Sequence, residues 1–569
     1  MAALYADGIT SLPGDGEAPP PTTEDRRRGG SITTPFIIAT MFGLTLASTG
    51  SLNNLIVFLI KNFNIKRIDA AQINNVVNGC VNFFPLVAAL LADSLLGCFS
   101  LIWISSLISL LGHILLVLTV TVDSLKPPAC DYSGSNSCPT PSMTQYAMLY
   151  SALALVSIGV GGTRFTLATM GANQLTILSQ QSSYFDRYFF SFYSASFIGA
   201  TGIVYIEDNL SWGRGFLICI AANVLGLVLF LIGSRYYTRD KPRASPLVSL
   251  FRVVVASVRK RNAAISSEIA DYYYGDDEVV ISEAPTKRFR QLNRAALKTE
   301  GDILSNGSIA SPWKLCSVEQ VEDLKSLIRI LPLWSSSIFL GTPIGVQISL
   351  TVVQALATNR HLSRTFEFPA ATILVFSLIS TAIGVAFIDH CFRPLWKITA
   401  GENPITPLQQ IGIGHVFNIA SMAVSALVES RRRSSAVSGH LMSVVWLVPQ
   451  MVVVGIGEAF HFPGQVGLYY QEFPTCLKSL STAMVAMLIG VAFYLSTAVL
   501  AFIRRITDWL PDDIDYGRVD YVYWVMVAIG IINFGYFLLI SWSFKVQKWG
   551  EVVNEDEIVS GDEECTRQN

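Results

Sequence analysis

Long apolar stretches alternate with short polar ones along almost the whole chain. Twelve of them approach the roughly 20 residues that an α-helix needs to cross a bilayer. The pattern therefore predicts an all-α membrane protein with twelve transmembrane helices, at about 36–60, 76–96, 99–122, 145–170, 187–206, 214–234, 328–356, 369–389, 408–428, 440–467, 479–503 and 520–544.

The longest polar interruption, from Arg235 to Leu327, divides the predicted helices into two groups of six. Two six-helix halves joined by a long loop are typical of transporters that bind their solute at the midplane between the halves. Within the loop, residues 246–260 alternate apolar and basic positions, which predicts an amphipathic helix lying on the membrane. We expect a disordered N-terminus at 1–34, the halves at 35–234 and 328–544, a cytosolic linker at 235–327, and an acidic, disordered tail at 545–569.

Composition agrees with a protein that lies largely in lipid. Of the 569 residues, 51% are hydrophobic and 14% are charged, with a mean hydropathy of +0.46. A soluble domain carries about 25% charged residues. The net charge of −2 says little about partners beyond the bilayer, and nothing in the sequence points to nucleic acid.

Orientation is only weakly indicated by charge. An even number of helices places both termini on one side, and basic residues 26–28 favour the cytosol for that side. Basic residues at 61, 66 and 67 and at 431–433, in the loops after the first and ninth helices, lie on the opposite side and weaken the argument. No segment resembles a cleavable signal peptide.

Arg164 is the most informative single residue, because it is the only charged residue between Asp131 and Asp186. A guanidinium at the centre of a bilayer costs about 2.5–3.5 kcal/mol, so such a residue faces a water-filled cavity or a partner. The planar N–H donors of its guanidinium match the arrangement of oxygen atoms in a small oxyanion. The alternative is an ion pair that only holds two helices together.

Glu458 is the matching acidic residue in the second half, with His461 one helical turn later on the same face. A carboxyl group in a low-dielectric environment readily takes a proton. If Glu458 faces Arg164, the two could form a salt bridge that a proton or an anion breaks, or a permanent structural bridge. We interpret His113, inside the third helix, as a helix-packing residue.

Other classes of function find little support. The sequence contains no P-loop, no nucleophile elbow and no cluster of metal-ligating residues, so we expect neither an enzyme nor a bound cofactor or metal. A non-transporting receptor or scaffold acting through the linker and tail is the alternative from another class. Cys130 and Cys138 share one polar loop and would be able to form a disulfide if that loop is extracellular.

A set of ordered motifs resembles the plant nitrate/peptide transporters, the proton-coupled oligopeptide transporter branch of the major facilitator superfamily. They extend from Pro35 to about Phe544, and their number and order make the resemblance specific. The motifs include residues 93–97, 159–164, 171–174, 204–209, 321–332, 455–460 and 517–524. The resemblance implies the major facilitator fold and transport driven by existing gradients.

Departures from the family pattern are equally informative. The family's first helix normally carries a Glu-x-x-Glu-Arg/Lys motif used in proton coupling, and its charged positions fall here on Met41, Leu44 and Thr45. In the gating loop that begins with Asp93 and Gly97, the usual Arg is replaced by Cys98.

These departures resemble the nitrate excretion transporter subgroup of the plant plasma membrane. The resemblance implies efflux or low-affinity passage of nitrate, with weak or altered proton coupling. The predicted contacts with the anion are Arg164, Glu458, Thr45 and His461. Chloride, larger solutes such as glucosides or hormones, and drift in an inactive relative remain alternatives.

Overall fold

The computed structural model describes residues 29–128, 139–175, 178–238, 246–266, 268–275, 285–303, 309–364, 366–400, 405–472 and 481–566. Eleven stretches in these ranges are long and apolar enough to cross a membrane, and one of them, Arg67–Thr121, has 55 residues. A straight helix of that length would extend about 80 Å, far more than the roughly 30 Å of a bilayer core. The stretch instead folds back at a π-helical turn, η3 (Ala92–Leu96), so that twelve crossings result, as predicted.

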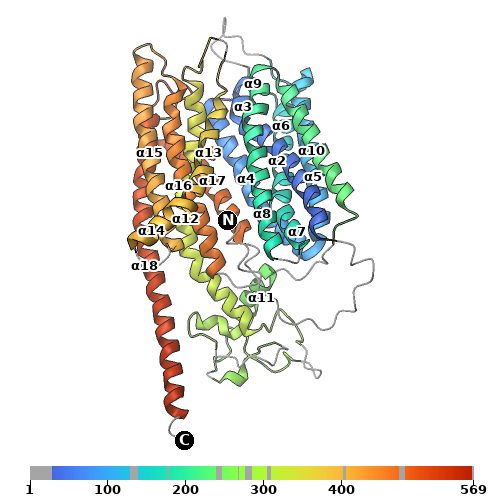
Figure 1. The fold of residues 1–569 in the computed structure, drawn as a ribbon, viewed down its shortest axis with the longest axis vertical. Helices are drawn as coiled ribbons and strands as arrows, with labels where there is room; N and C mark the ends of the chain where they lie inside the picture. The colour runs from blue at the N-terminus through green and yellow to red at the C-terminus, as the bar shows by residue number, and fades with distance from the viewer. Residues whose placement is uncertain are drawn as a thin grey trace.

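The first half contains six crossings, several of them broken into shorter helices (Figure 1). In chain order they are α2 (Thr34–Asn53) with α3 (Leu55–Phe63), α4 (Arg67–Leu91), α5 (Gly97–Thr121), α6 (Met143–Arg164) with α7 (Thr166–Asn173), α8 (Leu178–Ile198) with the π-helix η5 (Gly199–Ile203) and α9 (Val204–Asn209), and α10 (Trp212–Gly233).

The second half repeats the number of crossings with longer helices. They are α12 (Val318–Leu356), the segment η8 (Ala370–Leu374), α13 (Val375–Phe387), η9 (Ile388–Phe392) and α14 (Arg393–Ala400), then α15 (Pro407–Val437), η10 (Val444–Leu447) with α16 (Val448–Glu472), α17 (Ser481–Ile506) and α18 (Val519–Thr566). The last helix continues through most of the tail that we expected to be disordered.

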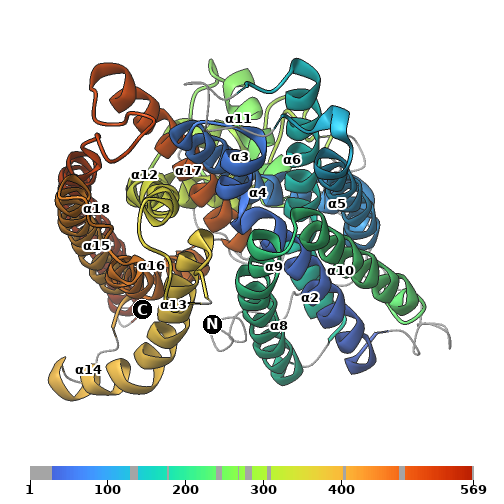
Figure 2. The same ribbon diagram turned by 90° about the horizontal axis from the view of Figure 1, so that it is seen from above.

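The two halves lie side by side and meet along α4 and α17 (Figure 2). Glycines allow the close approach, since a Cβ added at Gly79 would lie 2.6 Å from the ring of Tyr494, and one at Gly490 would lie 2.9 Å from the Gly79 carbonyl oxygen. The hydroxyl of Tyr494 lies 3.1 Å from the sulfur of Cys80. Small residues are the usual means of bringing membrane helices together.

Charged residues reinforce the contact between the halves on the face opposite the linker. Four ion pairs among the described residues join the halves, and all four lie on that face: Lys66–Asp512 at 2.6 Å, Arg67–Asp513 at 3.9 Å, Arg360–Asp208 at 3.5 Å, and Arg504 with Asp69. Of the basic residues after the first helix, Lys66 and Arg67 thus pair with acidic residues of the second half, whereas Lys61 pairs with Asp208 of the first half.

The linker forms a small folded unit on the N-terminal end of α12. Its helix α11 (Pro246–Arg259) is the predicted amphipathic helix, but Leu250, Val253 and Ala256 are buried against the linker and α12, not against a bilayer. Lys260 lies 2.6 Å from Asp302. Burial alone would raise the pKa of the Asp302 carboxyl, but hydrogen bonds from Lys260 and Thr299 lower its pKa below the ordinary value.

The ninth crossing is longer than predicted and contains a buried ion pair. Because α15 continues to Val437, Arg432 lies inside the helix and not in a loop. Its Nε and Nη2 atoms donate to the carboxylate of Glu429 at 2.8 and 2.9 Å, and Nη1 donates to Asp515. Both Arg432 and Glu429 are almost fully buried, so each compensates the other's loss of hydration.

We expect Arg432→Met to destabilise the fold by about 3–5 kcal/mol, because it leaves the Glu429 carboxylate buried without its cation. The double variant Glu429→Gln/Arg432→Met should recover part of this loss. Heating the detergent-solubilised protein and recording the surviving monomer by fluorescence size-exclusion measures the effect. The neighbouring exposed residue provides the control, since Arg431→Met removes only a cation–π contact with Trp446. Equal melting of the two single variants would contradict the role of the buried pair.

Candidate functional site

A cavity of about 370 Å³ lies between the halves. Helices α2, α4, α6 and α8 line it from the first half, and α12, α13, α16 and α17 line it from the second. The walls differ in character. Hydroxyl and amide side chains gather on the first half, including Thr45, Ser48, Thr49, Asn78 and Asn82, whereas aliphatic and aromatic side chains dominate the second.

Glycines set the position of α6, the helix that carries Arg164. A Cβ at Gly159 would lie 2.5 Å from the backbone nitrogen of Ser109 on α5, and one at Gly162 would lie 2.1 Å from the hydroxyl of Ser105. On the α4 side, Gly161 touches Phe84 in the same way. Only glycine permits contacts this close on both sides, and the last residue of the helix then faces the cavity.

The end of α6 is supported by tyrosines of α8. The helix stops at Arg164 and restarts as α7 after Phe165, so backbone carbonyls near the break lose their helical partners. The hydroxyl of Tyr188 donates to the carbonyl of Arg164 at 3.0 Å. Tyr184 packs against Gly171 and lies 3.4 Å from two carbonyls of α7. These contacts fix the backbone from which the guanidinium extends.

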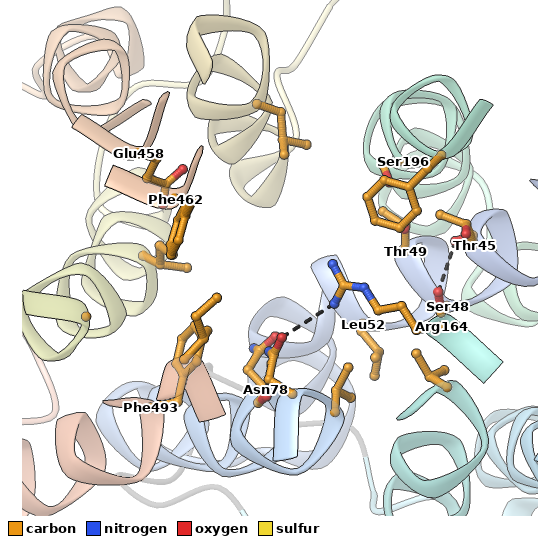
Figure 3. A pocket seen from close by; sticks show the side chains of 18 of the residues that line it. Thr45, Ser48, Thr49, Leu52, Asn78, Arg164, Ser196, Glu458, Phe462 and Phe493 are labelled. Atoms are coloured by element: carbon orange, nitrogen blue, oxygen red, sulfur yellow. Dashed lines mark hydrogen bonds between the residues drawn. The ribbon is translucent and has the colours of Figure 1, made fainter. Parts of the chain in front are cut away.

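The Arg164 guanidinium lies in the cavity with weak partners (Figure 3). Its Nη1 atom is 3.5 Å from the Oδ1 atom of Asn82, at the limit of a hydrogen bond. The rings of Phe192 and Phe165 lie 5.2 and 5.7 Å from its central carbon. Within the described ranges, Arg164 has no ion pair with a carboxylate, so the structural salt bridge that we considered is not formed.

Glu458 occupies the opposite wall, on α16 (Figure 3). Its Oε2 atom accepts a hydrogen bond from Thr381 on α13 at 3.3 Å. His461 lines the same wall, and its buried Nδ1 atom has no hydrogen-bond partner within the described structure. The cavity therefore separates Arg164 and Glu458, for which the sequence also allowed a direct ion pair.

The three replaced positions of the family's coupling motif all line the cavity. Met41, Leu44 and Thr45 lie on α2, where Thr45 donates to the sulfur of Met41 at 3.4 Å. The hydroxyl of Ser48 bonds to the Thr45 carbonyl at 3.0 Å. The first half of the cavity thus presents a thioether and hydroxyls where the family pattern has two carboxylates and a basic residue.

The other predicted positions lie away from the cavity. The gating loop that contains Asp93 is the π-helical turn between α4 and α5, and Gly97 ends it with φ of 72°, a left-handed conformation that favours glycine. Cys98 is half-buried and packs near Ala88 and Leu101. Cys130 and Cys138, the proposed disulfide, lie outside the described residues.

Sequence reasoning missed several polar residues. Asn78 and Asn82 are spaced by four, a signal for one polar helix face that we did not use. Ser196, Tyr188 and Phe192 follow from no motif. His113, by contrast, is buried as expected and lies within 3.1 Å of the Ser51 hydroxyl and 2.8 Å of the Ser109 carbonyl. No group of three potential metal ligands occurs in the described part of the chain.

Comparison with known proteins identifies the family. The model of the POT family, PTR2, matches residues 99–514. The chain is 49% identical over 525 residues to Protein NRT1/PTR FAMILY 2.7 of Arabidopsis thaliana, covering 91% of this chain and 93% of that protein. It is also 49% identical over 536 residues to Protein NRT1/PTR FAMILY 2.3 of the same plant, covering 94% and 96%.

Solved structures share the fold at low sequence identity. An auto-inhibited POT family peptide transporter matches with a TM-score of 0.67 at 16% identity, over 90% of this chain and 96% of that chain. The POT family transporter PepTSo matches with a TM-score of 0.66, also at 16% identity, over 91% and 99%. The chain therefore belongs to the POT family of membrane transporters and has the major facilitator fold; it is a transporter and not an enzyme.

Proposed function

We propose that the protein transports small inorganic anions, above all nitrate, by alternating exposure of the central cavity to the two sides of the membrane. The observation that carries this proposal is the Arg164 guanidinium, which lies in the cavity without a carboxylate partner among the described residues. An unneutralised cation in a low-dielectric site attracts an anion strongly.

The surroundings of Arg164 favour an oxyanion. Thr45, Ser48 and Thr49 on α2 and the amide groups of Asn78 and Asn82 on α4 line the same part of the cavity. These side chains can donate hydrogen bonds to oxygen atoms that the guanidinium does not reach. The cavity has no carboxylate at the replaced positions Met41, Leu44 and Thr45, so repulsion toward an anion is reduced.

Glu458 is the proposed partner or proton site on the opposite wall. Its distance from the anion contact allows it to respond to a proton without first breaking an ion pair with Arg164. Since the first-helix motif is replaced, proton coupling would be weak or altered relative to the family pattern. His461, one turn along α16, completes the proposed set of cavity contacts.

The cellular setting is part of the same proposal. We place the protein in the plasma membrane with both termini in the cytosol, where it would mediate efflux or low-affinity passage of nitrate. The loop of Asp93, Gly97 and Cys98 would act as a gate on the cytosolic side. The motifs that resemble the nitrate excretion subgroup, together with the basic residues 26–28, support this setting.

A larger organic solute is the second candidate, and the cavity volume favours it. About 370 Å³ falls in the range that binds drug-sized molecules and greatly exceeds the space that one nitrate ion needs. Chloride is a further candidate because a guanidinium does not by itself select for an oxyanion. A pure scaffold has no need of a solvent-accessible cavity with buried charge.

Nitrate flux should fall about tenfold or more in Arg164→Ala, because loss of a buried charge contact typically costs at least 2 kcal/mol. Arg164→Lys should restore only part of the flux, since a single ammonium lacks the planar fork. Nitrate efflux from proteoliposomes under an imposed membrane potential measures this, with chloride and a glucoside as competing solutes.

The matched control is Arg187→Ala, which removes an exposed arginine of α8. Nitrate flux that is equal in the Arg164→Ala and Arg187→Ala proteins would refute the anion contact. Flux of the glucoside without flux of nitrate would favour the second candidate.

Nitrate uptake by the wild-type protein should weaken as pH rises through the range in which Glu458 loses its proton, because the negative carboxylate then faces the anion across the cavity. Glu458→Gln should behave like the protonated form, with a low KM that rises less with pH than the KM of the wild type. Initial rates between pH 5 and 8 at clamped membrane potential provide the measurement. A pH profile unchanged by the substitution would exclude Glu458 as the group responsible.

A further inference from the structure

A further buried carboxyl group, Glu207, lies outside the central cavity at the end of α9. Its side chain is 1% exposed. One neutral donor reaches it, the amide of Asn54, whose Nδ2 atom is 3.1 Å from Oε2. The other oxygen, Oε1, is buried and has no partner in the described part of the structure.

Close packing holds this carboxyl group in place. A Cβ added at Gly215 on α10 would lie 2.2 Å from the Cγ atom of Glu207, so the acidic side chain fits against bare backbone. The same helix carries the buried thiol of Cys219 one turn further on. A bulkier residue at position 215 would displace Glu207.

The charged and titratable groups around Glu207 either have other partners or are exposed. Asp208, the next residue on α9, pairs with Lys61 of α3 and with Arg360 of the second half. His113 of α5 bonds to Ser51 of α2. Arg214 of α10 is exposed. Among the described residues, no cation contacts the Glu207 carboxyl group.

Such an environment strongly favours the protonated form. A buried ionised carboxylate without a cation has a free-energy cost of several kcal/mol, and one amide donor offsets only part of it. A protonated carboxyl group needs far less compensation. Contact with water, by contrast, would stabilise the ionised form.

The segment that carries Glu207 also forms contacts between the two halves on the face opposite the linker. The hydroxyl of Thr372 donates to the carbonyl of Ala200 in η5 at 3.2 Å. The ring of Tyr205 stacks on that of Phe366, with centroids 6.0 Å apart. Asp208 lies 3.5 Å from Arg360. A π-helix such as η5 is often found where a helix changes shape for function.

We infer that Glu207 is a proton-binding site whose occupancy stabilises closure of the halves on the face opposite the linker. This inference rests on the alternating access of the proposed function, but not on the identity of the solute. With the proton bound, α9 stays packed on Asn54 and Gly215, and Asp208 and Tyr205 reach the second half. Loss of the proton destabilises that packing and therefore favours opening on this face.

The sign of the pH dependence follows from linkage. The closed arrangement binds the proton more tightly than an arrangement in which water reaches Glu207, so low pH stabilises closure. The fraction of molecules that are closed on this face should fall as pH rises. Contact of the ionised Glu207 carboxylate with water should stabilise the open arrangement. Glu458 is not required for this effect, because it lies in the central cavity.

The test measures the distance across this face without any solute. Spin labels on unnatural amino acids at the exposed positions Leu210 and Leu362 avoid interference from the nine native cysteines. Double electron–electron resonance on the reconstituted full-length protein then gives the fraction of molecules in which the two labels lie close together, at each pH between 5 and 8. We expect that fraction to fall severalfold with rising pH in the wild type, and to stay near its pH 5 value in Glu207→Gln.

The matched control is Glu367→Gln, which removes a half-buried carboxylate that pairs with Arg360 on the same face. In this variant, the pH at the midpoint of the change in the short-distance fraction should equal that of the wild type. A pH-independent wild type, or a Glu207→Gln protein that retains the full pH shift, would overturn the inference.

A second variant covers the case in which Glu207→Gln does not fold. Asn54→Ala removes the donor that stabilises the charged carboxylate of Glu207. The midpoint of the change in the short-distance fraction should therefore move to higher pH. An unchanged midpoint would also overturn the inference. Because no nitrate is present, failure here is distinct from failure of the Arg164 and Glu458 predictions.

Discussion

The arrangement of the protein depends on placing one guanidinium in a low-dielectric cavity without a carboxylate beside it. A buried cation is tolerated only where water, dipoles or a solute replace its lost hydration. Here the Asn82 amide, the Phe192 ring and the cavity surround Arg164. The glycines of α6 and the tyrosines of α8 keep the side chain directed into the cavity and not into a helix interface. Residues of α2, α4, α6 and α8 thus position or surround the Arg164 guanidinium.

The distribution of the remaining buried charge follows a different rule. Arg432 and Glu429 neutralise each other inside the second half and have no access to the central cavity. Such a pair mainly fixes how helices pack. Arg164 and Glu458 are separated by the cavity, and Glu207 has only an amide. The charges of these three groups are incompletely compensated, and for this reason we propose them as the sites that respond to solute or protons.

The ion pairs between the halves add a constraint on movement. They join the N-terminal end of α4 and the end of α9 to the second half on one face, whereas the linker and the extended α12 occupy the other. Apart from the more buried Arg360–Asp208 pair, they lie partly exposed, and such ion pairs contribute little free energy each and are exchanged readily for water. They suit a contact that must form and break, while the glycine-rich α4–α17 contact deeper in the molecule has the tight packing expected of a pivot.

Much of the architecture follows from the sequence alone. Apolar length and the polar break at 235–327 determined the twelve crossings and their division into two halves, because a bilayer imposes helix length and internal hydrogen bonding directly on the chain. The isolation of Arg164 and Glu458 in apolar surroundings identified them as candidate site residues for the same reason. The tertiary structure decided which charges share a space. Arg164 and Glu458 face each other across a cavity, Arg432 is neutralised by a residue one turn away, and Glu207 is buried by Gly215, eight positions later on another helix. Charge compensation depends on distances of a few ångströms between helices, and no local pattern in the sequence specifies those distances.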